Sequence, residues 1–187
     1  MNRAHLEFLA SPEWAQMIES DLVPWLLTVA DLGDDVLEIG PGPGLTTDVL
    51  RLRTARLTAV ELDPQLATAL AARLSGTNVE VVRADATDSG LASNRFSSVT
   101  CFSMLHHMPS PDHQDRLFAE VLRVLRPSGV FIATDSIDSE PIRQFHEDDI
   151  FVPVNPDQLA SRLEAVGFAS VAVEPADYQV RFRATKA

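Results

Sequence analysis

The 187-residue sequence has little cysteine, little lysine and no long hydrophobic run. Its one cysteine, Cys101, has no partner for a disulfide, and it lies in the apolar run SVTCFSML, where a thiol behaves as a small buried hydrophobe. The apolar runs are of strand length and fall short of the ~18 residues that a membrane span needs. No charged-then-apolar leader follows Met1. These absences predict a cytoplasmic protein with no membrane span.

Positive charge is also scarce. The sequence has 15 lysines and arginines against 27 acidic residues, a formal net charge of -12, and Lys186 is its only lysine. Binding to DNA or RNA draws much of its free energy from cations that displace counterions at the phosphates. The charge balance therefore predicts that nucleic acid is not a partner.

The remaining composition is that of an ordinary globular protein. Hydrophobic residues make up 45% and charged residues 22% of a chain whose length is typical of one domain. The sequence contains no internal repeat and no low-complexity tract. We expect a single folded domain with one well-developed core.

Short strand-like runs alternate with amphipathic segments from residue 36 onward. Strands are predicted at 36–40, 56–62, 79–84, 98–103 and 129–135, followed by two more in ASVAVEP and YQVRFRAT; helices are predicted near 44–53, 64–75, 112–126 and 156–166. This alternation is typical of parallel strands joined by right-handed crossovers. It predicts an α/β fold with a Rossmann-like, doubly wound, seven-stranded and mostly parallel sheet, helices on both faces and an antiparallel terminal strand.

The segment VLEIGPGPGLTT combines a buried strand, three glycines and the start of a helix. Gly40, Gly42 and Gly44 let the chain turn sharply and bring its N–H groups close to a ligand beyond the carboxyl end of the strand. A dinucleotide fingerprint needs glycine or alanine where Leu45 stands, and a phosphate-binding Walker loop needs glycine and then lysine there. The spacing therefore favours a nucleotide-type site of another kind.

Acidic residues follow the next two predicted strands. Glu61, in AVELDPQLA, can accept two hydrogen bonds from ribose hydroxyls, whereas Asp63 before Pro64 reads as a helix cap. Asp85, in VVRADATD, can accept a hydrogen bond from an exocyclic amine, with the N–H of Ala86 beside it. Because parallel strands end at one edge of the sheet, these features together predict one ligand site.

In this order the motifs resemble the class I S-adenosylmethionine-dependent methyltransferases, particularly those with small-molecule, lipid or polyketide-like acceptors. The resemblance is close over residues 34–135, through VLEIGPGPG, AVELDP, VVRADATD, FSMLHHMP and VLRVLRPSGVFIATDS, and looser over PDQLASRLEAVGF and the terminal hairpin. Many relatives carry aspartate where this chain has Ser97, which is expected to change local hydrogen bonding only. The residues that the resemblance assigns to S-adenosylmethionine are Glu38, Gly40, Pro41, Gly42, Gly44, Glu61, Leu62, Asp85, Ala86, Ser103 and Met104.

The same resemblance divides the chain into four parts. Residues 1–33 form an N-terminal helical cap, 34–135 the cofactor-binding core, 136–154 a short variable cap, and 155–187 a C-terminal helix and β-hairpin. All four belong to one methyltransferase domain, and the two caps are expected to enclose the methyl acceptor.

A methyltransferase of this kind mainly positions its acceptor, because the sulfonium of the cofactor already activates the methyl group. His106, in MLHHMPSP, is the candidate general base, with His107 beside it. No metal is predicted, because adjacent histidines do not easily converge on one ion, and Asp112, His113 and Asp135 have no ligand spacing.

The expected function is methyl transfer to a small or medium-sized, neutral organic acceptor. The negative net charge of the protein disfavours anionic acceptors. Arg143, Arg181 and Arg183 still allow one contact with a carboxylate. The aromatic residues expected around the acceptor are Trp14, Trp25, Phe145 and Phe151. Two alternatives remain: a protein of the same fold that binds S-adenosylmethionine without turnover and, less favoured, a nicotinamide-dependent oxidoreductase.

Overall fold

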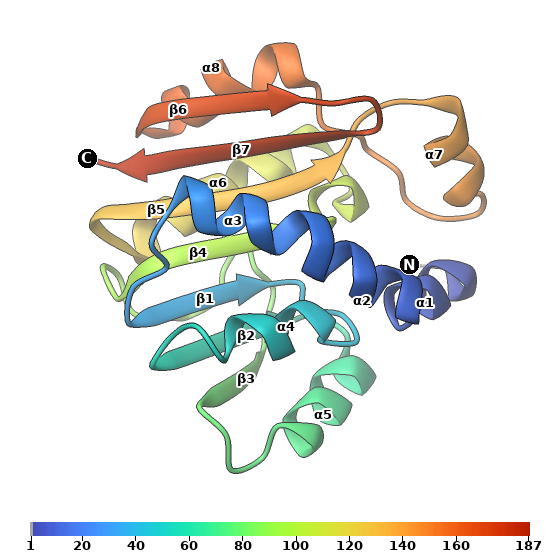
Figure 1. Ribbon diagram of the computed structural model, residues 1–187. Helices are drawn as coiled ribbons and strands as arrows, with labels where there is room; N and C mark the ends of the chain where they lie inside the picture. Colours follow the sequence, from blue (N-terminus) through green and yellow to red (C-terminus); the bar gives the residue numbers. More distant parts are fainter. Residues whose placement is uncertain (1) are drawn as a thin grey trace.

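The computed structural model describes residues 2–187, without the side chains of Arg3 and Ala4 (Figure 1). The helices are α1 (Arg3–Leu9), α2 (Pro12–Met17), the π-helical η1 (Ile18–Leu22), α3 (Val23–Val29), α4 (Leu45–Leu50), α5 (Pro64–Arg73), the 3-10 turn η2 (Leu105–His107), α6 (Pro111–Val124), α7 (Glu140–Phe145) and α8 (Pro156–Val166). The strands are β1 (Asp35–Ile39), β2 (Arg56–Glu61), β3 (Val79–Arg83), β4 (Phe96–Phe102), β5 (Leu125–Ser136), β6 (Phe168–Pro175) and β7 (Gln179–Lys186). In this part of the chain no helix combines the length and apolarity needed to cross a membrane.

The seven strands form one sheet in the order β3-β2-β1-β4-β5-β7-β6. The first five strands of that order pair in parallel, whereas β7 runs antiparallel to both β5 and β6. The strand order reverses between β1 and β4, which is where open α/β sheets bind ligands. The predicted fold class is confirmed, including the antiparallel terminal strand.

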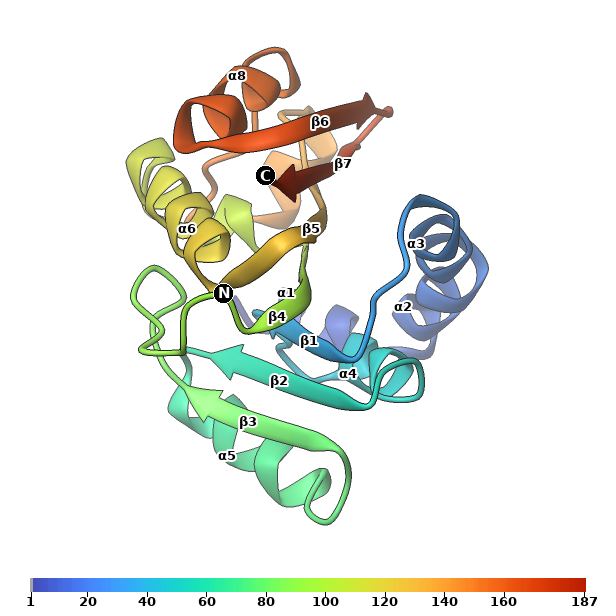
Figure 2. The same ribbon diagram turned by 90° about the vertical axis from the view of Figure 1, so that its left-hand side faces the viewer.

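Helices cover both faces of the sheet, with α3 and α4 on one side and α6 and α8 on the other (Figure 2). Neighbouring strand residues point to opposite faces, so Val36 packs toward α3 and α4 while Leu37 packs toward α6. Phe118 of α6 and Phe131 of β5 are fully buried in the larger of the two layers. Because β1 is buried along its whole length, its carboxyl end is rigidly placed.

Capping side chains define several helix starts, among them the cap at Asp63 that the sequence indicated. The Ser11 hydroxyl accepts a hydrogen bond from the N–H of Trp14 at 3.1 Å, which starts α2. Asp63 caps α5 through the N–H groups of Gln65 and Leu66. Pro24 lies in the first turn of α3, directly after the π-helical turn η1.

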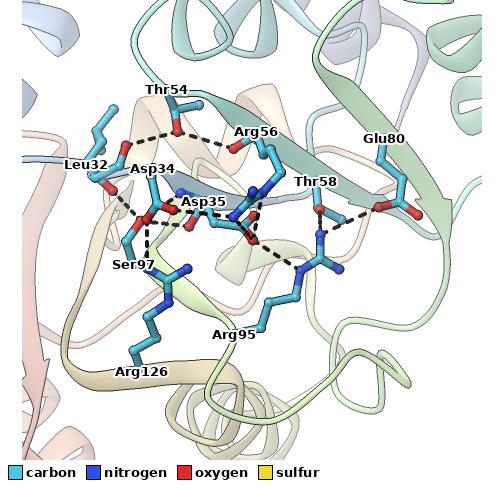
Figure 3. Close-up of polar contacts among 11 residues, drawn as sticks. Leu32, Asp34, Asp35, Thr54, Arg56, Thr58, Glu80, Arg95, Ser97 and Arg126 are labelled. Atoms are coloured by element: carbon cyan, nitrogen blue, oxygen red, sulfur yellow. Dashed lines mark hydrogen bonds and ion pairs between the residues drawn. The ribbon is translucent and has the colours of Figure 1, made fainter.

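A polar network joins the starting ends of the strands, at the opposite edge from the glycine loop (Figure 3). Ser97 donates to the carbonyl of Leu32 at 2.8 Å and accepts from the N–H of Asp35 at 3.1 Å. Arg126 Nη1 binds Asp34 Oδ1 at 2.7 Å. Ser97 thus takes part in local hydrogen bonding far from the predicted site.

Candidate functional site

A pocket of about 680 Å³ opens at the carboxyl ends of β1, β2, β3 and β4. This volume is within the range of small-molecule sites. Three kinds of residue line it: the glycine loop, the strand ends and an apolar wall from α1, α2 and the loop after β4. The lining residues include Leu6, Leu9, Trp14, Gly40, Pro41, Gly42, Thr46, Glu61, Leu62, Asp63, Asp85, Ala86, Ser103, Met104, His107, Met108 and His113.

The three glycines of the loop have different structural roles. All three have positive φ angles, which side chains adopt with strain. A Cβ on Gly40 would lie 2.5 Å from the Met104 side chain, and one on Gly44 would lie 2.3 Å from Leu70 of α5. A Cβ on Gly42 would meet only Leu9, at 4.0 Å, and would point into open pocket space. Gly42 therefore faces the ligand space, whereas Gly44 lies outside the pocket wall and lets α4 pack against α5.

Glu61 joins the end of β2 to the glycine loop. Its side chain is 8% exposed, and its Oε2 accepts a hydrogen bond from the N–H of Gly42 at 3.1 Å. Its Oε1 accepts from the N–H of Asp63 at 2.9 Å. Each carboxylate oxygen keeps a lone pair for a further donor. Glu61 is thus a fixed acceptor at the floor of the pocket.

Glu38 lies behind the loop and not on the pocket wall. The side chain is 2% exposed, and it accepts a hydrogen bond from the hydroxyl of Thr46 in the first turn of α4. Burial raises its pKa to about 7. The expected direct contact with the cofactor would have to pass Thr46, which does line the pocket. The geometry therefore gives Glu38 a role in holding the loop against α4.

The predicted adenine side of the site also comes together. Leu62 is 65% exposed although it is apolar, and it lies on the pocket wall with Asp85 and Ala86. Asp85 Oδ1 accepts from the N–H of Thr87 at 2.8 Å, which fixes the turn after β3. An exposed leucine beside a carboxylate and a backbone N–H suits a flat aromatic base with polar edges.

Asp135, near the end of β5, organises the loop that follows β4. Its Oδ2 accepts from the N–H groups of Met104 at 3.0 Å and Leu105 at 2.7 Å, and its Oδ1 from those of His106 at 3.2 Å and Ser136 at 2.8 Å. This buried carboxylate places Met104 against Gly40. Sequence reasoning missed this role, because it depends on contacts between Asp135 and residues about 30 positions earlier in the chain.

His106 does not lie where a general base was expected. Its Nδ1 is 2.7 Å from Asp135 Oδ1, and the side chain is 1% exposed. The hydrogen bond to Asp135 thus holds the His106 ring away from the pocket, and His107 lines the pocket wall instead. Burial, together with the neighbouring His106, lowers the pKa of His107 to about 2. His107 is therefore a weak base near neutral pH.

Of the four aromatic residues expected around the acceptor, only Trp14 lines the pocket. Trp25 packs with the guanidinium of Arg181 above its ring, 5.4 Å from the centroid. Phe145 packs on His5 with ring centroids 4.9 Å apart, and Phe151 stacks on His146. Leu6 and Leu9 of α1 contribute to the apolar wall instead. Two leucines on one short helix form no sequence pattern that would mark them as pocket residues.

Comparison with known proteins assigns the family. Residues 37–133, just over half of the chain, match the methyltransferase domain family, and the chain therefore belongs to it. The class predicted from the sequence, the class I S-adenosylmethionine-dependent methyltransferases, is confirmed.

Curated relatives with different names match parts of the chain. A probable ribosomal RNA small subunit methyltransferase A of Methanopyrus kandleri is 40% identical over 72 residues, which are 37% of this chain and 26% of the relative. A ubiquinone biosynthesis O-methyltransferase of Pseudomonas syringae pv. tomato is 34% identical over 117 residues, which are 60% of this chain and 49% of the relative. The chain thus spans between a quarter and a half of the length of these relatives.

Solved structures share the fold over nearly the whole chain. The complex named DhpI-SAM-HEP has a TM-score of 0.74 over 99% of this chain and 92% of that one, at 23% identity. A SAM dependent methyltransferase from Archaeoglobus fulgidus has a TM-score of 0.75 over 92% and 94% of the two chains, at 15% identity. At these identities the likeness shows the architecture alone.

Proposed function

We propose that the protein transfers a methyl group from S-adenosylmethionine to a small or medium-sized, neutral organic acceptor. The observation that carries the proposal is the junction of Glu61 with Gly42 beneath a pocket of about 680 Å³. At this junction a buried carboxylate, the open space beside Gly42 and an apolar wall lie together at the switch point of the sheet.

The residues of the pocket fit this cofactor. Glu61 is placed to hold ribose hydroxyls, and Leu62 offers an apolar face to adenine, whose polar edge can reach Asp85 and Ala86. The missing side chain at Gly42 leaves space for the rest of the cofactor. When bound, the cofactor supplies an electrophilic methyl group on its sulfonium.

The contribution of the chain is positioning and the exclusion of water. Leu6, Leu9 and Trp14 close one side of the pocket, and Met104 and Met108 close another. The proposal includes no general base, because His106 does not reach the wall and burial keeps the pKa of His107 far below neutral.

The charge of the wall favours a neutral acceptor. Among the side chains that the structure describes, no lysine or arginine lines this pocket, whereas three acidic side chains, Glu61, Asp63 and Asp85, do. Arg143 pairs with Asp138 at 2.6 Å, so its charge is already compensated. A polyanion such as the ribosomal RNA named for one relative would find no cationic partner for its phosphates among the described side chains at this opening.

The test is methyl transfer from S-adenosylmethionine labelled in its methyl group to a cell extract. The extract is divided into solvent-extractable metabolites and total RNA, and the Gly42→Val protein serves as the control. We expect label in the metabolite fraction with the wild-type protein only. Label in RNA would overturn the neutral acceptor, and no transfer to any fraction would favour a binding protein without turnover.

A further inference from the structure

Four of the five histidines gather beside the pocket although they come from three distant segments. His5 lies in α1, His106 and His107 form part of η2, and His146 directly follows α7. One ring nitrogen from each lies within 4.8 Å of those of the other three. His5, His106 and His146 are at most 4% exposed. The four rings therefore share one buried space, although the sequence offered no metal-ligand spacing.

Hydrogen bonds determine which nitrogen of two rings faces this space. His146 Nδ1 lies 2.7 Å from the carbonyl oxygen of Ile142, which only accepts, so Nδ1 carries the proton. His106 Nδ1 lies 2.7 Å from Asp135, a carboxylate that already accepts four backbone N–H groups, so this Nδ1 also donates. In both neutral rings Nε2 then presents a lone pair to the cluster.

These lone pairs have no donor within the described part of the chain. Nε2 of His106, Nε2 of His146 and Nδ1 of His5 are buried and without a hydrogen-bond partner there. The same holds for both nitrogens of His107, one of which carries the ring proton; its Nδ1 lies 3.8 Å from Oδ2 of Asp149. A buried polar atom left unpaired costs about 1–3 kcal/mol, so four converging imidazoles are a costly arrangement unless something binds between them. One cation placed between the rings can accept several of these lone pairs at once.

We propose that His5, His106, His107 and His146 bind one divalent transition-metal ion, with zinc as the expected ion. Imidazole nitrogen is a preferred ligand of zinc, and four such ligands suit its tetrahedral geometry. The Nδ1 protons of His106 and His146 are held by a carboxylate and a carbonyl, the partners that orient metal-bound histidines. A tetrahedral zinc ion holds its ligand nitrogens about 3.3 Å apart. The two ligand nitrogens that lie farthest apart in the cluster therefore have to approach each other by roughly 1.5 Å.

Four protein ligands make this a closed, structural site. It would tie α1 and the segment after α7 to the loop that follows β4. The N–H of Asn2 already contacts Asp149 at 2.7 Å, and its side chain contacts the carbonyl of Phe145 at 3.1 Å, so the same segments are joined without metal. Since α1 supplies Leu6 and Leu9, the metal would hold one wall of the pocket in place. The inference does not depend on the proposed function.

The experiment uses the full chain without a histidine tag, stripped of metal by a chelator. Zinc is titrated in competition with a chromophoric chelator into the wild type, His5→Ala, His146→Ala and, as the matched control, His113→Ala. His113 binds Ser110 and lies outside the cluster. We expect one zinc ion per chain in the wild type and in His113→Ala. The two ligand variants should bind it more than about 100-fold less tightly, a larger loss than the 10–100-fold caused by losing an outer partner.

A second measurement requires no variant. Cobalt(II) replaces zinc in the stripped wild-type protein, and its visible absorption is recorded with excess magnesium present. Strong tetrahedral bands, together with a rise in the melting temperature on adding zinc but not magnesium, are expected. Weak octahedral absorption, or equal zinc affinity in wild type, His5→Ala and His146→Ala, would overturn the site.

Discussion

The backbone N–H of Gly42 donates a hydrogen bond of 3.1 Å to Oε2 of Glu61. This bond joins the loop after β1 to the end of β2, two strands that pair in parallel throughout their length. The glycine loop and the acidic side chain of Glu61 therefore form one hydrogen-bonded unit at the floor of the pocket. Substitutions at Glu61 and at Gly42 test the two partners of this bond separately.

Glu61→Ala should weaken S-adenosylmethionine binding by about 1.5–3 kcal/mol, or about 10- to 150-fold, the scale of hydrogen bonds to a charged group. Calorimetric titration measures the affinity. Glu80→Ala is the control, because Glu80 is an exposed β3 residue that contacts Arg95 at 3.6 Å and does not line the pocket. Unchanged affinity in Glu61→Ala would make Glu61 merely a partner of the loop.

Gly42→Val should abolish cofactor binding while the chain still folds, because the new side chain would fill open pocket space. Gly76→Val is a matched control. Gly76 also has a positive φ, of +79°, and nothing lies within 4 Å of a Cβ there, so the backbone strain is similar but the pocket is untouched. Both variants should lose some stability, and only Gly42→Val should lose affinity. Equal affinities would contradict the assignment of the loop.

Glu38 should make the stability depend on pH. Burial raises its pKa from 4.5 to about 7 in the folded state, so between these values the folded chain holds a proton that the unfolded chain has released. The free energy of unfolding therefore falls as the pH rises through this window. Relative to Glu38→Gln, which stays neutral, the wild type should lose about 3 kcal/mol between pH 4.5 and about 7.

Denaturant unfolding of both proteins at a series of pH values measures this difference. Other groups titrate in the same window, but they are common to both proteins and cancel in the comparison. Parallel pH profiles for wild type and Glu38→Gln would show that the buried carboxyl does not hold its proton.

Cys101 should be inert in the native protein. It is fully buried in β4, and burial raises the pKa of its thiol well above the ordinary value, so little thiolate is present and reagents have no access. A chromogenic thiol reagent should react only at the rate of unfolding, and with one thiol per chain in denaturant. Rapid modification of the native protein would contradict the burial of β4.

Local patterns were sufficient to predict the strand–glycine–helix segment and the acidic residue after β2. Gly42 and Glu61 belong to elements whose order, spacing and parallel pairing can be deduced from hydrophobic periodicity and turn residues. Glu38 and Gly44 were also found, but as ligand contacts. In the structure neither residue lines the pocket: Glu38 accepts a hydrogen bond from Thr46, and Gly44 lies close to Leu70 of α5. These positions depend on tertiary packing, which local sequence patterns do not reveal.

The position of the histidines could not be predicted in this way. His5 and His146 are 141 positions apart, and no periodic pattern connects them. The orientation of His106 depends on Asp135, which belongs to another strand. Such contacts exist only once the sheet is assembled and α1 lies beside the segment after α7. Sequence reasoning therefore assigned His106 to the reaction and missed the cluster.

The most direct test of the account is calorimetric titration of the purified wild-type chain with S-adenosylmethionine and, separately, with NADH. The pocket at the carboxyl ends of β1 to β4 predicts one S-adenosylmethionine per chain, displaced by S-adenosylhomocysteine, and no heat with NADH. Saturable binding of NADH, or no binding of S-adenosylmethionine by folded protein, would contradict it.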